Sequence, residues 1–346
     1  MSDFLKKHAP TNPLAIDQDG SVSGLLEKMR SISFQGRNLG NAYDVWKSML
    51  EDKTTIMMGM AGAMSAGGMR RLVTYMIQHR MIDVLCSTGA NFFHDIYESI
   101  GHFHYIGSPH ADDTHLVDEM VDRVYDTYAD EREFRLLDDY IGDFTGRLDQ
   151  SRGYTTREFL YLLGQEVSKI AKEDGIVTSA YKHNVPLYCP AVADSSIGIG
   201  VAESRYRGKN KFLFDVAQDV VETARIAAES PVTGVIYFGG GTPKNFIQQT
   251  QVTALIMSEA VPGHKYAIQV CVDMPQWGGL SGCTFEEAQS WGKIAKDARM
   301  VMVHCDATIG MPMLVTGLAH QCKETLQKRR RPSFKMDQDL KMSFAN

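Results

Sequence analysis

The stretch Thr55-Ile-Met-Met-Gly-Met60, which runs on into Ala61-Gly-Ala-Met-Ser-Ala-Gly-Gly68, decides the fold. Its first part is apolar on both faces, as a central parallel strand covered by helices requires. Its second part is a turn of small residues. Beyond the turn, apolar residues recur with helical spacing at Met69, Leu72, Val73, Met76 and Ile77. This segment therefore predicts one strand–turn–helix unit.

Further units of the same kind follow along the chain. Short apolar runs recur at Met81–Cys86, Val185–Cys189, Gly234–Phe238, Tyr266–Val272 and Met300–Cys305. Helical spacing returns between them, at Thr155–Glu173 and Asp215–Glu229. Repeated units of this kind predict an α/β fold, with a doubly wound, mainly parallel, Rossmann-like sheet flanked by helices and right-handed crossovers.

We expect a single large domain with two additions at its ends. Residues 1–50 predict an N-terminal helical segment, 51–328 the α/β domain, and 329–346 a C-terminal tail. Residues 102–153 are charged and poor in strand signals, so they predict helical excursions outside the main sheet. The basic run Lys328-Arg-Arg-Arg331 predicts favourable charge at a helix C-terminus, followed by a solvated tail.

Composition excludes several classes of function. The chain has 346 residues and a net charge of −6, which argues against nucleic acid as its main partner. Its six cysteines form no CxxC pair, which is typical of reduced thiols in a cytoplasmic protein. The N-terminus lacks the apolar core of a signal peptide, and no apolar run reaches membrane-spanning length.

A cluster of histidines invites a metal interpretation that we set aside. His102, His104, His110 and His115 lie close together in the sequence. Their spacing matches no zinc pattern, and no cysteine is near them. We expect surface or hydrogen-bonding histidines and no metal site.

Two glycine turns and two acids follow predicted strands. In open α/β sheets, ligands bind at the carboxyl ends of the strands. Gly59-Met-Ala-Gly62 and Gly239-Gly-Gly241 would let backbone N–H groups approach a pyrophosphate, although neither is a G-x-G-x-x-G motif. Asp194 and Asp306 could bind ribose hydroxyls or simply cap helices. The residues alone leave nucleotide binding and plain turns both open.

The run Phe285-Glu-Glu-Ala-Gln-Ser-Trp-Gly-Lys-Ile294 carries the candidate nucleophile. Thr284 and Glu287 form a capping-box pattern, which predicts a helix that carries Lys293 on its first turns. Lys293 is either a solvated charge or an amine that forms an imine with a substrate. A lysine nucleophile must be neutral, so burial has to lower its pKa from about 10.4.

The run Glu287-Ala-x-Ser-Trp-Gly-Lys-Ile294 resembles the active-site motif of deoxyhypusine synthase and its relative homospermidine synthase. The resemblance covers nearly the whole chain. Its other segments are Phe34–Gly40, Gln78–Leu85, Pro186–Gly198, Gly239–Ile247 and Asp306-Ala307.

The resemblance implies an NAD-dependent transferase of alkyl groups other than methyl, active in polyamine metabolism. A polyamine is oxidised beside its secondary nitrogen, the lysine captures the imine with loss of diaminopropane, and the aminobutyl group passes to an acceptor amine. Lys293 matches the nucleophile, while Glu287 and Trp291 match residues that hold the polyamine. The family is a homotetramer with sites between paired subunits. The positions matched to NAD binding are Gly62, Ala63, Met64, Ser65, Ala66, Thr88, Gly89, Asp194, Gly240, Asp306 and Ala307.

The chain departs from the family where polyamine charges are neutralised. Paired glutamates become Phe93 and His94, an aspartate becomes Ile199, and a histidine becomes Asn245. The family's Gly-Ser-Asp stretch is Gly278-Gly-Leu280, and its asparagine in the first nucleotide turn is Ala63. An ammonium without a partner costs several kcal/mol to desolvate. We therefore expect a less cationic amine, with Phe93, Ile199 and Leu280 as apolar lining and with His94 replacing a proton-accepting carboxylate.

Several functions stay open on this basis. The acceptor is a small amine such as putrescine, as in homospermidine synthase, or a lysine of a translation factor, as in deoxyhypusine synthase. A third reading is a non-catalytic NAD-binding relative, against which Lys293 argues because a buried lysine without a role is costly.

Overall fold

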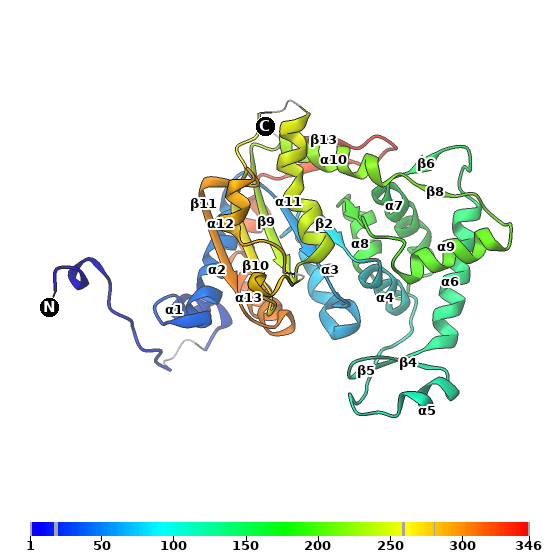
Figure 1. Cartoon of the computed structure of the whole chain (residues 1–346), viewed down its shortest axis with the longest axis horizontal. Helices are drawn as coiled ribbons and strands as arrows, with labels where there is room; N and C mark the ends of the chain where they lie inside the picture. The colour runs from blue at the N-terminus through cyan, green and yellow to red at the C-terminus, as the bar shows by residue number, and fades with distance from the viewer. Residues whose placement is uncertain (1, 17–19, 258–259, 280, 345–346) are drawn as a thin grey trace.

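The computed structural model describes residues 2–16, 20–257, 260–279 and 281–344. A six-stranded sheet lies at its centre, with helices on both sides (Figure 1). The strands of this sheet are β1 (Thr54–Met60), β2 (Val84–Ser87), β7 (Leu187–Tyr188), β9 (Val232–Phe238), β10 (His264–Val270) and β11 (Ile294–Val303). Each of them overlaps an apolar run that the sequence marked as a strand, although β11 begins at Ile294, before the run expected at Met300–Cys305.

The order of the strands defines where a ligand can bind. It is β11-β10-β9-β1-β2-β7, and every neighbouring pair is parallel. This is the doubly wound order in which the chain starts in the middle and reverses direction between β1 and β9. All seven residues of β1 are buried, as double coverage by helices requires. The predicted fold class is confirmed.

Helices cover both faces of the sheet. On one face α2 (Phe34–Glu51) packs on β10 and β11, and α13 (Ala307–Gln321) packs against α2. α11 (Gly241–Ile256) packs on β1, β2 and β9, and α10 (Val216–Glu229) packs against α11. The other helices of the α/β body are α1 (Val22–Met29), α3 (Arg70–Gln78), α4 (Gly89–Ser99), α7 (Thr156–Val167), α8 (Ile176–His183), α9 (Ser196–Tyr206), α12 (Phe285–Ser290) and α14 (Lys323–Lys328). Shorter elements are the helical turns η1 (Leu5–Lys7), η2 (Ser65–Met69) and η3 (Pro275–Trp277) and the paired strands β6 (Gly153–Tyr154) and β8 (Leu213–Phe214).

Residues 102–153 contain a sheet that the sequence reasoning missed. Besides α5 (Asp113–Asp118) and α6 (Glu131–Gly146), they form three antiparallel strands. These are β3 (Tyr105–Ile106), β4 (Val121–Val124) and β5 (Thr127–Asp130), which Figure 1 shows with α5 at the far end of α6. The β4–β5 turn places Tyr125 at φ 55°, without the Asn-Gly or Asp-Gly pair that marks such turns. The expectation of helices alone was therefore wrong.

The C-terminal residues are not a solvated tail. β12 (Pro332–Lys335) and β13 (Lys341–Phe344) form an antiparallel hairpin. Arg329 and Asp83 are both fully buried, and their side chains pair at 2.5 Å. Arg329 also donates to backbone carbonyls of Thr54 and Arg80, so its charge is neutralised and both of its terminal nitrogens are hydrogen-bonded. Of the four residues in the basic run, only Lys328 lies in the last turn of α14, where the sequence predicted a favourable positive charge.

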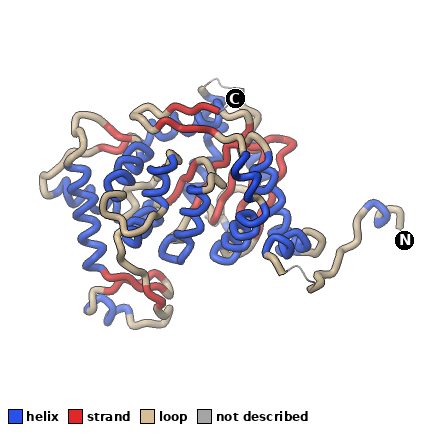
Figure 2. The backbone as a smooth tube through the Cα atoms, turned by 180° about the vertical axis from the view of Figure 1, so that it is seen from behind, coloured by secondary structure: helices blue, strands red, loops and turns tan. Residues whose placement is uncertain are grey.

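The N-terminal segment is helical only in part. Residues 2–16 carry one short turn and extend away from the body, as Figures 1 and 2 both show. The six cysteines are free, and three of them are buried, namely Cys86, Cys189 and Cys322. Among the described residues, no helix is both long and apolar enough to cross a membrane.

Candidate functional site

Two turns at the carboxyl edge of the sheet are joined by one asparagine. Asn91, on α4, accepts a hydrogen bond from the backbone N–H of Ser65 at 2.9 Å and donates to the carbonyl of Gly62 at 3.0 Å. The Thr88 hydroxyl also donates to the Gly62 carbonyl, at 2.7 Å. The structure therefore brings the predicted cofactor residues after β1 and those after β2 together. The sequence reasoning missed Asn91, which makes no motif of its own.

The glycines after β9 meet the turn after β1. Gly239 has φ 81°, and a Cβ on it would lie 3.0 Å from the Cβ of Ala61. Gly240 is the N-cap of α11, and Gly241 has φ 58° with open space where a side chain would be. Exposed backbone N–H groups at a helix N-terminus suit a phosphate. These small residues lie at the ends of β1 and β9, where the strand order reverses.

The two acids after strands differ in their local role. Asp306 is the N-cap of α13, since its Oδ1 accepts from the Thr308 N–H at 2.7 Å, which confirms the capping alternative for it. Ala307 is the first residue of that helix. Asp194 is exposed, and the N-cap of α9 is Ser195 instead. Capping therefore does not account for Asp194.

Gly89 allows the Asp194 turn to approach α4. A Cβ on Gly89 would lie 2.1 Å from the Ser195 hydroxyl oxygen, so no larger residue fits without displacement. The matched cofactor positions consequently lie at the carboxyl ends of β1, β2, β7, β9 and β11, along one edge of the sheet.

Lys293 does not lie on a helix. α12 begins as predicted, because the Thr284 hydroxyl accepts from the Glu287 N–H at 3.0 Å, but it ends at Ser290. Gly292 adopts φ 72°, and the Lys293 N–H donates to the Ala288 carbonyl at 3.1 Å. This closing turn is a Schellman motif, for which a left-handed glycine is the usual terminator. The sequence prediction was wrong because Gly292 stops the helix.

The side chain of Lys293 contacts an exposed tryptophan. Its Nζ lies 5.3 Å from the centre of the Trp291 ring, within cation–π range. Trp291 is 62% exposed, Glu287 is exposed, and Lys293 is only half-buried. A single chain thus supplies little of the burial that a neutral lysine requires.

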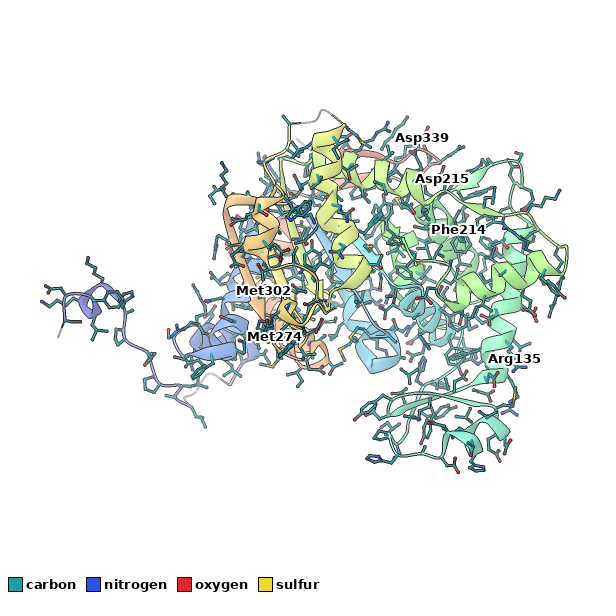
Figure 3. The ribbon with its side chains drawn as sticks, viewed as in Figure 1. Arg135, Phe214, Asp215, Met274, Met302 and Asp339 are labelled. Atoms are coloured by element: carbon teal, nitrogen blue, oxygen red, sulfur yellow. The ribbon has the colours of Figure 1, made fainter. Side chains whose placement is uncertain are left out.

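Lys293 and the cofactor turns lie at opposite edges of the sheet. The Lys293 carbonyl accepts from the N–H of His264, the first residue of β10. The turns follow the other ends of the strands, and the seven residues of β10 span about 20 Å. Figure 3 labels Met274, which follows β10, at the lower edge, whereas α12 lies higher in Figure 1.

A buried lysine anchors the loop in front of α12. Lys244 is fully buried, and its Nζ donates to the Gln269 side chain and to the carbonyls of Ser281 and Cys283, each at 2.7 Å. Burial lowers the pKa of Lys244 to about 8, and the charge of Lys293 acts in the same direction. Asn245, its neighbour, lies beside the same loop, 3.4 Å from where a Cβ on Gly282 would be.

The other positions at which this chain departs from the family lie in different environments. Phe93 is buried against Phe134, with ring centres 5.2 Å apart, so the expected role as pocket lining was wrong for it. Ile199 is exposed on α9. His94 is 8% exposed and shares a 2.9 Å hydrogen bond with His104. Leu280 lies outside the described residues.

A groove of about 700 Å³ lies beside α12, between α2 and β11, and is lined by polar groups such as Asn38, Asp44 and Arg299. Lys293 does not line it.

In the part of the chain that the structure describes, no three His, Cys, Asp or Glu side chains are arranged to hold a metal ion.

The comparisons with known proteins identify the family of the chain. The family model described as deoxyhypusine synthase matches residues 24–318. A relative in Methanosarcina mazei, named "Probable deoxyhypusine synthase 2", is 50% identical over 95% of this chain and 95% of its own length. A "Deoxyhypusine synthase-like protein" of Coxiella burnetii is 37% identical over 86% and 85% of the two chains.

A solved structure supports the fold. The crystal structure of "a putative deoxyhypusine synthase" from Entamoeba histolytica superposes with a TM-score of 0.59 at 18% identity, over 88% of this chain and 95% of that one. Family model, relatives and fold agree along most of the sequence. The chain therefore belongs to the deoxyhypusine synthase family.

Proposed function

We propose that this chain is an NAD-dependent transferase that moves an aminobutyl or related alkyl group from an amine donor to an acceptor amine through an imine on Lys293. The observation that carries the proposal is the terminus of α12, where a left-handed Gly292 turns Lys293 against the Trp291 ring. Family membership supplies the reaction class, because the matched motif contains this lysine.

The carboxyl edge of the sheet fits NAD. Gly240 begins α11 without a side-chain cap, and nothing lies within 4 Å of where a Cβ on Gly241 would be, so a pyrophosphate could approach the backbone beside the reversal point. Asp194 and Asp306 would hold ribose hydroxyls, with Asp306 doing so in addition to its capping bond. When bound, NAD would accept a hydride from the donor carbon next to nitrogen.

Lys293 supplies the covalent step. Its neutral amine adds to the imine carbon of the oxidised donor, the old carbon–nitrogen bond breaks, and the other half of the donor leaves as a primary amine. The acceptor amine then displaces Lys293 in the same way. Bound NADH would supply the reducing power for the resulting imine. Trp291 would hold a cationic nitrogen of the donor on its ring face, with Glu287 nearby.

A second copy of the chain would complete the site. Within one chain, the backbone of Lys293 and the cofactor turns lie at opposite sheet edges, and Trp291 is mostly exposed. Packing the α12 end of one copy on the cofactor edge of another would bury Lys293 and bring it to NAD. We propose a homo-oligomer, a tetramer of paired subunits, as the active form.

The donor is a less cationic amine than spermidine in the family's pose. Ile199 and Asn245 supply no negative charge where the family has charged or titratable groups, and an unpaired ammonium is costly to desolvate. His94 and Asn245 would contact the donor instead of carboxylates.

The test is a product assay with purified protein, NAD and single amines. Spermidine, putrescine and less charged amines are offered in turn, with and without a second amine as acceptor, and released and transferred products are identified by mass spectrometry. Release of a primary amine that requires NAD and is lost in Lys293→Arg supports the proposal. Its absence with every amine, despite measurable NAD binding, would leave only the non-catalytic reading.

A further inference from the structure

A chain of three titratable side chains joins α4 to the small antiparallel sheet. His94 Nδ1 lies 2.9 Å from His104 Nε2, and His104 Nδ1 lies 2.7 Å from Glu98 Oε1. His94 and Glu98 are one helical turn apart on α4, whereas His104 comes from the segment just before β3. Two hydrogen bonds therefore connect a carboxylate to an imidazole through a second imidazole.

The chemistry of the three groups determines which atom donates in each of the two hydrogen bonds. An ionised carboxylate can only accept, so His104 carries its proton on Nδ1 and donates it to Glu98. His104 Nε2 is then the acceptor, and His94 must donate from Nδ1. The free lone pair of His94 is consequently on Nε2. Arg70, whose Nη1 lies 3.8 Å from Glu98, keeps positive charge beside the carboxylate.

Aromatic rings enclose the two imidazoles. Phe134, from α6, has its ring centre 5.4 Å from that of His94, and Tyr97 lies 5.3 Å from His104. Burial, the largest cause, lowers the pKa of His94 to about 4; protonation of His104 would also lower it, and Glu98 opposes both. His94 is therefore neutral at pH 7, as a proton acceptor must be. A second pair, His102 with Glu133 at 3.4 Å, borders the cluster but is not part of it.

The cluster lies close to the proposed cofactor edge. α4 starts at Gly89, directly after the turn that holds Thr88, and His94 is five residues further on, about 8 Å along the axis. α4 also packs against α9, the helix that follows Asp194. The small antiparallel sheet lies beyond the end of α6, on which Figure 3 labels Arg135. The residues 102–104 that precede this sheet bring His104 to α4.

We propose that Glu98, His104 and His94 form a proton relay, and that His94 Nε2 is the base for donor oxidation. This inference rests on the proposed function. During donor oxidation, for which bound NAD would be the hydride acceptor, the donor nitrogen loses a proton to His94 Nε2. The Nδ1 proton of His94 shifts to His104 Nε2, and the Nδ1 proton of His104 moves to Glu98. The same protons return when the product imine is reduced, so the relay is restored after each turnover.

The first test measures donor oxidation as the appearance of NADH in a single turnover. Glu98→Gln keeps a hydrogen-bond acceptor for His104 but removes the charge, and we expect the rate to fall about 10- to 100-fold. The acidic side of the pH–rate profile of this variant moves to lower pH. The reason is that the Glu98 charge, which favours protonated His94, is gone. His102→Gln is the matched control, since it alters the neighbouring pair and keeps the wild-type rate. Equal losses in both variants, or a pH–rate profile whose acidic side does not move, would overturn the relay.

The second test needs no turnover. Nitrogen NMR of isotope-labelled histidine, assigned with His94→Gln, reports which ring nitrogen carries the proton. The relay requires the Nδ1–H form at both His94 and His104, and Nε2–H at His94 overturns it. If the tautomers are as required but the wild-type chain oxidises no amine, the hydrogen-bond chain stands, whereas the proposed function and the base assignment both fail.

Discussion

Replacement of Lys244 by methionine removes a buried charge while keeping most of the side-chain volume. Lys244 is fully buried, and its Nζ donates to three neutral acceptors, the Gln269 side chain and the carbonyls of Ser281 and Cys283. Burial lowers its pKa from 10.5 to about 8. The variant therefore tests two opposed effects, the cost of the buried ammonium and the value of its hydrogen bonds.

The two effects nearly cancel at neutral pH. The lowered pKa means that the fold disfavours charged Lys244 by roughly 3 kcal/mol. Lys244→Met relieves this cost, but three buried acceptors lose their donor at about 1 kcal/mol each. At pH 7 we expect the free energy of unfolding to change by less than about 2 kcal/mol.

The pH dependence separates the two effects. Between pH 8 and 10.5, Lys244 is neutral in the folded protein and still protonated in the unfolded chain. The unfolded state then binds more protons, so this residue makes the folded state more stable as the pH rises. Lys244→Met lacks that contribution. Across this pH range, the free energy of unfolding of the wild type should rise by up to roughly 3 kcal/mol relative to that of the variant.

The assay is urea unfolding followed by circular dichroism at pH 7, 8.5 and 10, at one protein concentration because an oligomer unfolds in a concentration-dependent way. Lys296→Met, at an exposed position of β11, is the control and should run parallel to wild type. If the free energies of unfolding of wild type and Lys244→Met change in parallel with pH, the interpretation of Lys244 as a buried, charged group is refuted.

Three further substitutions test other parts of the structure. Arg329→Met leaves the Asp83 carboxylate with less compensation, and we expect a loss of about 3–5 kcal/mol in unfolding free energy, measured by urea titration; a loss below 1 kcal/mol, on the order of a surface ion pair, would contradict its burial. Gly89→Ala forces a side chain onto Ser195 and should weaken NAD binding in calorimetry, with recovery in Gly89→Ala/Ser195→Gly; no recovery would place the defect elsewhere. Trp291→Ala should raise the KM for a cationic donor about 5- to 30-fold, whereas Trp291→Phe should retain most of the affinity; equal effects would rule out the ring face as the contact.

Much of the fold could be predicted because its strands are buried on both faces. Such strands appear as continuous apolar runs, and Thr55–Met60 and Gly234–Phe238 needed no tertiary information. The glycine turns at their carboxyl ends were equally visible, because a left-handed or crowded backbone position, as at Gly239, demands glycine.

The remaining features depend on contacts between distant segments. Arg329 is one of four consecutive basic residues, and only its pairing with Asp83, far away in the sequence, distinguishes it from a solvated charge. His104 reaches His94 across a turn, and nothing in the spacing of the histidines reveals that contact. Lys293 was misplaced for a local reason, since Gly292 could equally have continued a helix at a cost of about 1 kcal/mol.

The most direct measurement is borohydride trapping of the enzyme-bound imine. Protein is mixed with NAD and the donor found in the product assay, reduced, digested and mapped by mass spectrometry. We predict one adduct, on Lys293, that carries the transferred alkyl group and requires both NAD and donor. Lys244, with its pKa lowered to about 8, is the internal competitor for that adduct. An adduct on Lys244, or none on Lys293 under conditions of turnover, would contradict the role of Lys293 as nucleophile.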